Sequence, residues 1–342
     1  MSRSSSSRVA GRGKPVLALL HKGFALNWPL ALGGLVMLVV LLAALLGVVV
    51  DHRIITGMPA WVKPAKFAIS ISIYSFTLLW LLHVLHGHQR LVRVLATSIA
   101  VGLCLEMLLI AGQVIRGTTS HFNYTTPLDG TLYTIMAVVI VSIFLLHIGV
   151  AVLLLRQHMT DPVLAWSMRL GLLLAGVGMA VAFLMTTAEL QQALYRVLHV
   201  LQPTVFHLAA LHPTRPHGIV GGHSVGVLDG GPGLPFLGWS TIGGDLRIPH
   251  FVGLHALQVL PLFGWLLGRR RCAALSVRRR VALVWVCALA YLGLIGLLTW
   301  QAMRAQPLLA PDALTLQAGA TLLVGIVLSM VGIVYLGRST TR

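Results

Sequence analysis

The chain has 342 residues, of which 57% are hydrophobic and only 10% are charged. A soluble domain carries roughly 25% charged residues, so this composition excludes an ordinary soluble globular protein, and the apolar excess excludes a disordered chain. The net charge of +17 is explained by basic segments that face the cytoplasm, which requires no nucleic-acid partner. The composition therefore indicates a multi-pass membrane protein.

Eight segments are apolar and long enough to cross a bilayer, which takes roughly 20 residues as a helix. In chain order they are 27–50, 64–85, 93–115, 131–155, 163–187, 250–268, 280–303 and 315–337. We expect an all-α membrane protein, a single bundle of about eight transmembrane helices over 27–342. Residues 1–26 are expected to form a basic cytoplasmic tail, and 188–249 a long irregular lid. Within the lid, 189–217 is a candidate interfacial helix.

Basic residues predict the orientation of the bundle. With the N-terminus inside, the short inner connections and both chain ends hold most of the arginines, whereas the outer segments balance their basic residues with acidic ones. This asymmetry places both termini in the cytoplasm. Together with an arginine-, alanine-, leucine- and glycine-rich composition, it favours the cytoplasmic (inner) membrane of a bacterium, with membrane lipids as the expected partners.

The first outer segment, 56–67, contains two lysines and ends at the start of a predicted span. Lys63 and Lys66 are three residues apart and share one face of a helix. Two ammonium groups at this place are candidates for binding an anionic substrate or a lipid headgroup. The alternative is that both lysines extend to the membrane interface beside Trp61 without binding a ligand.

The second outer segment, 116–130, and the span before it carry a further set of polar residues. The candidates are Glu106, Gln113, Arg116, His121, Asn123 and Asp129. Glu106 is placed near the bilayer centre, where a carboxyl group marks either a functional site or a hydrogen bond between two helices. His121 is a candidate metal ligand or proton carrier. Asp129 either takes part in the site or caps the helix that begins there.

The third outer segment, 221–258, is the richest in polar side chains. Its candidates are His223, Asp229, Asp245, Arg247, His250, His255 and Gln258. His255 and Gln258 share a helix face and are expected to point into the bundle. The glycines of this segment lack the phosphate-loop pattern G-x-x-x-x-G-K-[ST], so we exclude a nucleotide site of that type.

Because the candidate segments contain several histidines, a metal or haem centre is the first cofactor hypothesis, with Zn, Fe or Cu as candidate metals. His121, His223, His250 and His255 are the candidate metal ligands. His83 or His86 with His147 is a possible haem ligand pair near the inner face, and His255 with another outer histidine a second pair. The three cysteines, Cys104, Cys272 and Cys287, form no C-x-x-C pair and predict neither a disulfide framework nor a thiolate site.

The three outer segments, 56–67, 116–130 and 229–258, resemble those of a family of bacterial multi-pass inner-membrane proteins that has no assigned activity. The resemblance implies that these segments belong to one site, and it implies no cofactor or reaction.

Three functions remain open. The first is a metal- or haem-assisted enzyme or redox protein that acts on a lipid, a quinone or a small substrate. For this enzyme we take Glu106, His121, Asp129, His223, Asp229 and His255 as catalytic candidates, and Lys63, Lys66, Gln113, Arg116, Asn123, Asp245, Arg247 and Gln258 as substrate-binding candidates. The second is a proton-coupled transporter of a small anionic solute, with Glu106 as the proton carrier. The third is a non-catalytic assembly or sensor protein.

Overall fold

The computed structural model describes residues 14–186, 216–269 and 275–335. Within these ranges the chain is mostly helical, and eight helices are long and apolar enough to cross a membrane. The helices are α1 (Lys14–Leu26), α2 (Trp28–Val50), α3 (Val62–His83), α4 (Gln89–Ile115), α5 (Pro127–Arg156), α6 (Pro162–Val181) with the short 3₁₀ helix η1 (Ala182–Met185), α8 (Arg247–Leu267), α9 (Val277–Met303) and α10 (Ala313–Tyr335). The eight predicted spans are confirmed, and the chain is a multi-pass membrane protein.

Capping side chains set where several helices begin. The side chain of Asn27 accepts a hydrogen bond from the backbone N–H of Leu30 at 2.9 Å, at the start of α2. Thr126 caps α5 in the same way, because its Oγ1 accepts from the backbone N–H of Asp129 at 3.1 Å. Pro127 then fills the first helical position. The span therefore begins four residues earlier than predicted, and Thr126 rather than Asp129 is its N-cap.

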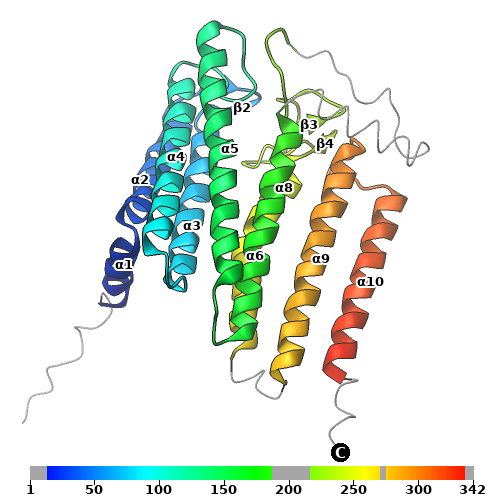
Figure 1. Cartoon of the computed structure of the whole chain (residues 1–342). Helices are drawn as coiled ribbons and strands as arrows, with labels where there is room; N and C mark the ends of the chain where they lie inside the picture. Colours follow the sequence, from blue (N-terminus) through cyan, green and yellow to red (C-terminus); the bar gives the residue numbers. More distant parts are fainter. Residues whose placement is uncertain (1–13, 187–215, 270–274, 336–342) are drawn as a thin grey trace, which may run out of the picture.

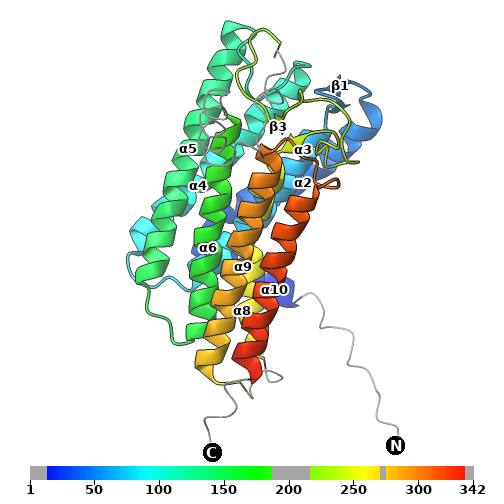
Figure 2. The same cartoon turned by 90° about the vertical axis from the view of Figure 1, so that its right-hand side faces the viewer.

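The spans lie side by side and alternate in direction (Figures 1 and 2). Since their number is even, α2 begins and α10 ends at the same end of the bundle. The connections 51–61, 116–126 and 216–246 gather at the opposite end, which we call the loop-rich end. The predicted tail residues 1–13 and residues 189–215 of the predicted interfacial helix lie outside the described residues.

Two short antiparallel hairpins lie in the loop-rich end. Strands β1 (Ile54–Ile55) and β2 (Met58–Pro59) pair with Ile54 opposite Pro59. Strands β3 (Ser224–Val225) and β4 (Gly244–Asp245) pair with Ser224 opposite Asp245. A Cβ atom on Gly244 would lie 1.9 Å from the carbonyl oxygen of Ala302, so glycine lets β4 rest directly on the end of α9. The irregular lid predicted for this end is present in its described part.

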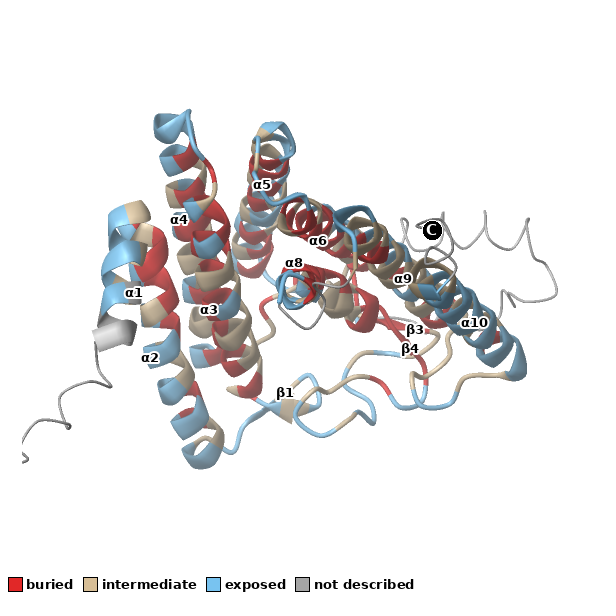
Figure 3. Cartoon of the chain, turned by 90° about the horizontal axis from the view of Figure 1, so that it is seen from below, coloured by how far each residue is buried: buried red, intermediate tan, exposed pale blue. Residues whose placement is uncertain are grey.

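The closest helix pair is α6 with α8, while α2 packs mainly on α3 and α10 packs on α9. Seen from below, the buried residues of α6 and α8 face the interior and α10 is exposed around most of its surface (Figure 3). The largest apolar cluster of the described residues joins α2, α3, α4, α5, α6 and α8, and its fully buried members include Leu78, Ile99, Met168 and Leu172. This cluster fills the bundle on the side away from the loop-rich end.

Candidate functional site

A cavity of about 470 Å³ lies at the loop-rich end. The start of α3, the β1–β2 hairpin, residues 114–122, residues 216–238 and the first turns of α8 form its wall. Six of the residues predicted from sequence line it, namely Lys63, Lys66, His121, His223, Asp229 and Arg247. Three segments that are far apart in the sequence therefore meet around one space.

Glycines hold the β1–β2 hairpin against the rest of the wall. Gly57 has a φ of 71°, and a Cβ atom there would lie 2.2 Å from the carbonyl oxygen of Gly230. Gly230 itself has a φ of 93°. Both positions require the left-handed backbone conformation that glycine adopts without strain. The contact closes the wall of the cavity between two segments that the sequence does not connect.

The two lysines enter the cavity from the first turns of α3. Lys63 Nζ lies 3.0 Å from His121 Nδ1. Lys66 Nζ donates a hydrogen bond to the carbonyl oxygen of Leu237 at 2.9 Å. Within the described part of the chain, neither ammonium group has a carboxylate at ion-pair distance. Among the described residues, the amine groups of both lysines therefore make their direct contacts with neutral groups.

His121 connects Lys63 to a buried carboxyl group. Its Nε2 lies 3.6 Å from Glu106 Oε1, and the other carboxyl oxygen, Oε2, has no hydrogen-bond partner among the described residues. Burial, and then the proximity of Lys63 and His223, holds the pKa of His121 well below its ordinary value. A neutral His121 accepts at Nδ1 from Lys63, because an ammonium group can only donate. Its proton is then on Nε2, which faces Glu106.

His223 and Asp229 form a second pair. The backbone N–H groups of His223 and Ser224 donate to the Asp229 carboxylate, and His223 Nδ1 lies 2.9 Å from Asp229 Oδ2. Burial would raise the pKa of Asp229, but its contacts with His223 and Ser224 outweigh burial and hold that pKa far below its ordinary value. Burial lowers the pKa of His223, and Asp229 opposes this shift. Nδ1–H donates to the carboxylate, and Nε2 has no hydrogen-bond partner among the described residues, so it can act as an acceptor.

Arg247 is fixed by the fold. Its guanidinium group donates to both oxygens of Asp245 and to the carbonyl oxygen of Gly238. Asp245 also accepts from the backbone N–H of Ser240 at 2.9 Å. Since this carboxylate neutralises the arginine, the pair positions β4 and the start of α8, and it adds little net charge to the cavity.

Asp129 belongs to a separate buried network beside the cavity. Its carboxylate accepts from Gln113 at 3.0 Å, from Arg116 at 2.7 Å and from Thr126 at 2.7 Å. Asn123 fixes the neighbouring turn, because its side chain bonds Thr118, Thr119 and Thr125. Gln113, Asn123 and Asp129 do not line the cavity. Their contacts join the end of α4 to the start of α5.

The candidate metal ligands do not form one ligand set in the described residues. His250 Nδ1 lies 2.7 Å from the carbonyl oxygen of Gly178. His255 Nδ1 lies 3.3 Å from Gln258 Oε1, one turn further along α8 than the cavity residue Phe251. No group of three or more His, Cys, Asp or Glu residues is suited to hold a metal ion in the part of the chain that the structure describes. The metal hypothesis therefore has no support from this arrangement.

The proposed haem ligand His147 is engaged at both ring nitrogens. Nδ1 lies 3.0 Å from the hydroxyl oxygen of Tyr74, and Nε2 lies 2.9 Å from the carbonyl oxygen of Leu172. His83 and His86 are exposed at the end of the bundle opposite the cavity. His147 is thus a buried link between α3, α5 and α6, and neither nitrogen is free to ligate iron.

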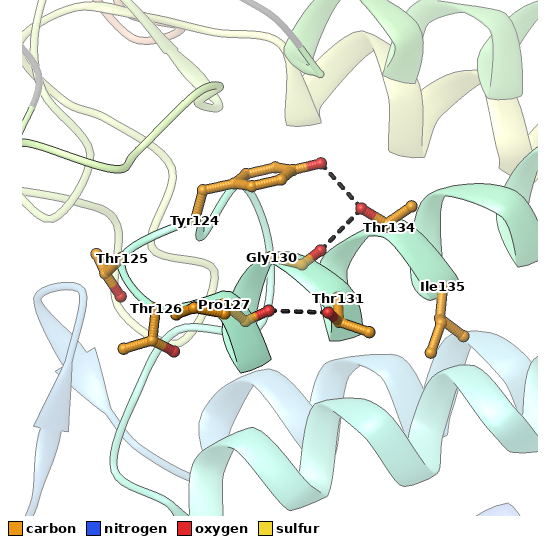
Figure 4. Close-up of a pocket in the computed structure, with 8 residues that line it drawn as sticks. All are labelled: Tyr124, Thr125, Thr126, Pro127, Gly130, Thr131, Thr134 and Ile135. Carbon is orange, nitrogen blue, oxygen red and sulfur yellow. Dashed lines mark hydrogen bonds between the residues drawn. The ribbon is translucent and has the colours of Figure 1, made fainter.

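A second pocket lies on the outside of α5 (Figure 4). It is lined by Tyr124, Thr125, Thr126, Pro127, Gly130, Thr131, Thr134 and Ile135. Thr131 and Thr134 donate to backbone carbonyl groups one turn earlier, and the Tyr124 hydroxyl is bonded to Thr134 (Figure 4). Because these polar groups are already paired, this pocket offers little to a ligand.

Sequence reasoning missed several residues that shape the cavity. Ser120 Oγ lies 2.9 Å from His121 Nδ1. Phe67 lies against the His121 ring, with centroids 5.8 Å apart, and Phe122 lies against the His223 ring, with centroids 5.1 Å apart. Ser120 and Phe122 are adjacent to the candidate His121 in the sequence, and this position could have indicated them. No local signal distinguishes Phe67 from the other apolar residues of α3.

No protein family, no characterised protein and no solved structure matches this chain. The resemblance of the outer segments to a family of bacterial inner-membrane proteins therefore stays a prediction. Function has to be inferred from the cavity itself.

Proposed function

We propose that this chain is a membrane-bound acid–base enzyme that binds an anionic substrate in the cavity at its loop-rich end. Lys63 and Lys66 bind the anionic group, and His223, oriented by Asp229, acts as the general base. One observation carries this proposal: in the described part of the chain, two lysines with no carboxylate at ion-pair distance line the same cavity as a histidine whose Nε2 has no hydrogen-bond partner. The chemistry requires these side chains and a water molecule.

The binding part follows from charge. An ammonium group that contacts only neutral partners in a partly dehydrated cavity gains more from an anion than a solvated surface lysine does, because the local dielectric constant is lower. Arg247 contributes less, since Asp245 already neutralises it. A phosphate or carboxylate group placed between Lys63 and Lys66 accepts two charge-assisted hydrogen bonds.

The catalytic part follows from the histidine tautomer. With its Nδ1–H bonded to Asp229 and its pKa lowered by burial, His223 is neutral at pH 7 and presents a basic Nε2. For an ester of phosphoric or carboxylic acid, Nε2 takes a proton from water while the water oxygen bonds to phosphorus or carbon. The leaving oxygen departs with that proton, and the lysines stabilise the negative charge that develops.

The expected location is the bacterial cytoplasmic membrane, with the loop-rich end outside and both termini in the cytoplasm. The surplus of basic residues at the other end supports this orientation. A cysteine introduced at the exposed Thr241 should react with a membrane-impermeant thiol reagent in intact cells, after replacement of the native cysteines. A cysteine at the exposed His158, at the opposite end, should react only after permeabilisation.

Turnover tests the enzyme. Wild-type protein in nanodiscs of bacterial total lipid is incubated with its lipids and with soluble phosphate and acyl esters, and products are followed by mass spectrometry. We expect His223→Gln to lower turnover by about 10²–10⁴-fold and Lys66→Gln to act mainly on KM. His158→Gln is the control, because it removes an exposed histidine far from the cavity. Equal turnover by His223→Gln and wild type would show that His223 is not the base.

Glu106 favours a second function, proton-coupled transport of an anion. The supporting observation is its buried Oε2, which has no hydrogen-bond partner among the described residues. Against it stands the apolar cluster around Leu78 and Leu172, which fills the bundle beyond Glu106. Transport predicts anion flux into proteoliposomes that is driven by a pH gradient and is lost in Glu106→Gln. Turnover without flux favours the enzyme, and flux without turnover favours the transporter.

A further inference from the structure

The cavity lies between the starts of two membrane-spanning helices. Lys63, Lys66 and Phe67 of α3 line one side, and Arg247 and Phe251 of α8 line another. On α3, Phe67 lies one turn beyond Lys63 and directly follows Lys66, and on α8 Phe251 lies one turn beyond Arg247. The lining therefore changes from cationic to apolar in the direction of the bilayer, as the headgroup and the chains of a lipid do.

Below the cavity, α3 and α8 are joined by one side-chain hydrogen bond. Gln258 Nε2 donates to Thr77 Oγ1 at 3.0 Å. Thr77 lies about 21 Å along α3 from Lys63, and Gln258 lies about 10 Å along α8 from Phe251. As whole helices, α3 packs mainly on α2, whereas α8 packs mainly on α6 and α9. We call residues 67–77 of α3 and 251–258 of α8 the α3–α8 seam.

The seam exposes a histidine in a membrane-spanning helix. His255 follows Phe251 by one turn, and it is exposed although it lies well inside α8. A polar side chain at such a depth is costly when it faces hydrocarbon. Ile73, 40% exposed, provides an apolar wall on α3. An amphiphilic molecule in the seam would cover both the polar surface of His255 and the apolar surface of Ile73.

We propose that the substrate is an anionic membrane lipid that enters the cavity sideways along the α3–α8 seam. Its phosphate pairs with Lys63 and Lys66, and its acyl chains stay along Phe67, Ile73 and Phe251. This inference rests on the proposed anion site at the lysines and adds the source of the anion. A cavity of about 470 Å³ has room for a headgroup and not for two acyl chains, so the chains of a bound lipid must lie outside it. Two lysines with no carboxylate at ion-pair distance in the described part of the chain favour an anionic headgroup over one that carries a choline cation.

Lipid binding is tested on full-length protein that has been delipidated in a neutral detergent. Native mass spectrometry measures the retention of dioleoyl phosphatidylglycerol, with dioleoyl phosphatidylcholine as the zwitterionic comparison. Calorimetry measures the binding of soluble glycerol phosphate, which has the same anionic group without acyl chains. We expect phosphatidylglycerol to bind at least tenfold more tightly than either comparison.

Two changes separate the headgroup site from the seam. The double variant Lys63→Gln, Lys66→Gln removes two charge-assisted contacts and should weaken phosphatidylglycerol and glycerol phosphate alike, by about 10²-fold or more. His255→Trp fills the seam and should weaken phosphatidylglycerol about tenfold while glycerol phosphate binding is unchanged. His158→Trp makes the same substitution at an exposed histidine of the opposite end and should change neither. Retained glycerol phosphate binding shows that His255→Trp is folded.

The outcomes distinguish the two proposals. If glycerol phosphate binds through the lysines and phosphatidylglycerol binds no better than phosphatidylcholine, the lipid proposal is wrong and the anion site stands. If His255→Trp leaves phosphatidylglycerol binding unchanged, entry along the seam is wrong. If neither probe depends on the lysines, both the anion site and the lipid proposal are wrong.

Discussion

The close contact between a glycine of α6 and a glycine of α8 should be important for the stability of the part of the bundle that includes the start of α8. A Cβ atom on Gly178 would lie 2.5 Å from the carbonyl carbon of Gly253 and 2.6 Å from its Cα. Ordinary contact begins at 3.4 Å, so Gly178→Ala has to separate the two backbones by about 0.9 Å. Overpacking of this kind costs about 1–3 kcal/mol, against a gain of about 0.5–1 kcal/mol from replacing glycine by alanine in a helix.

The expected net loss is therefore about 1–2 kcal/mol. The same substitution at Gly296 on α9 is the matched control, since nothing lies within 4 Å of a Cβ atom there. Gly296→Ala should be neutral or slightly stabilising. Unfolding in mixed micelles with increasing sodium dodecyl sulfate, followed by tryptophan fluorescence, measures both variants. If Gly178→Ala is as stable as Gly296→Ala, the close approach of α6 and α8 is not real.

Three further predictions concern side chains of the network, the interior and the cavity. Asp129→Ala leaves Arg116 and Gln113 without their partner and should lower the free energy of unfolding by about 2–4 kcal/mol. Asp129→Asn keeps a hydrogen-bond acceptor and should lower the free energy of unfolding less, as measured in the same micelle titration. His147→Leu removes two buried hydrogen bonds and should lower the free energy of unfolding by about 1–3 kcal/mol without changing the affinity for glycerol phosphate. A large change in that affinity would contradict the assignment of His147 as a structural link. Because the folded-state pKa of His121 lies below its unfolded value, the unfolded chain binds more protons, so stability should fall as the pH is lowered through about 6.5. Melting temperatures measured against pH should show a smaller decline for His121→Gln, and an equal decline would contradict this origin.

The eight spans could be predicted because crossing a bilayer is a local property of the chain. A segment surrounded by hydrocarbon must satisfy its own backbone hydrogen bonds, and about 20 apolar residues in a helix do so without help from other segments. Helix starts were less accurate, because a cap such as Thr126 depends on a single side chain. The irregular loop-rich end was also evident, since glycine, proline and polar residues gather between the spans.

The sequence predicted which types of residue form the candidate site, but not which of their side chains contact one another. Three of the four cationic candidates and two of the candidate histidines line one cavity. Asp129, Asn123 and Gln113 instead bond the ends of two helices. His250 and His255 have separate partners, which is why no metal group forms among the described residues. Residue type indicates what a side chain can do, and only its neighbours decide which of these roles it takes.

Hydropathy and charge in the linear chain are sufficient to establish a membrane protein with eight spans and a polar end. The pairing of His223 with Asp229 is nearly local, since the two residues are only six positions apart in the sequence. The approach of His121 to Glu106, the unpaired lysines and the contact of Gly178 with Gly253 depend instead on how separate helices dock. Helix docking is decided by the fit of many side chains at once, because in lipid the hydrophobic effect does not drive helices together and close packing selects the arrangement.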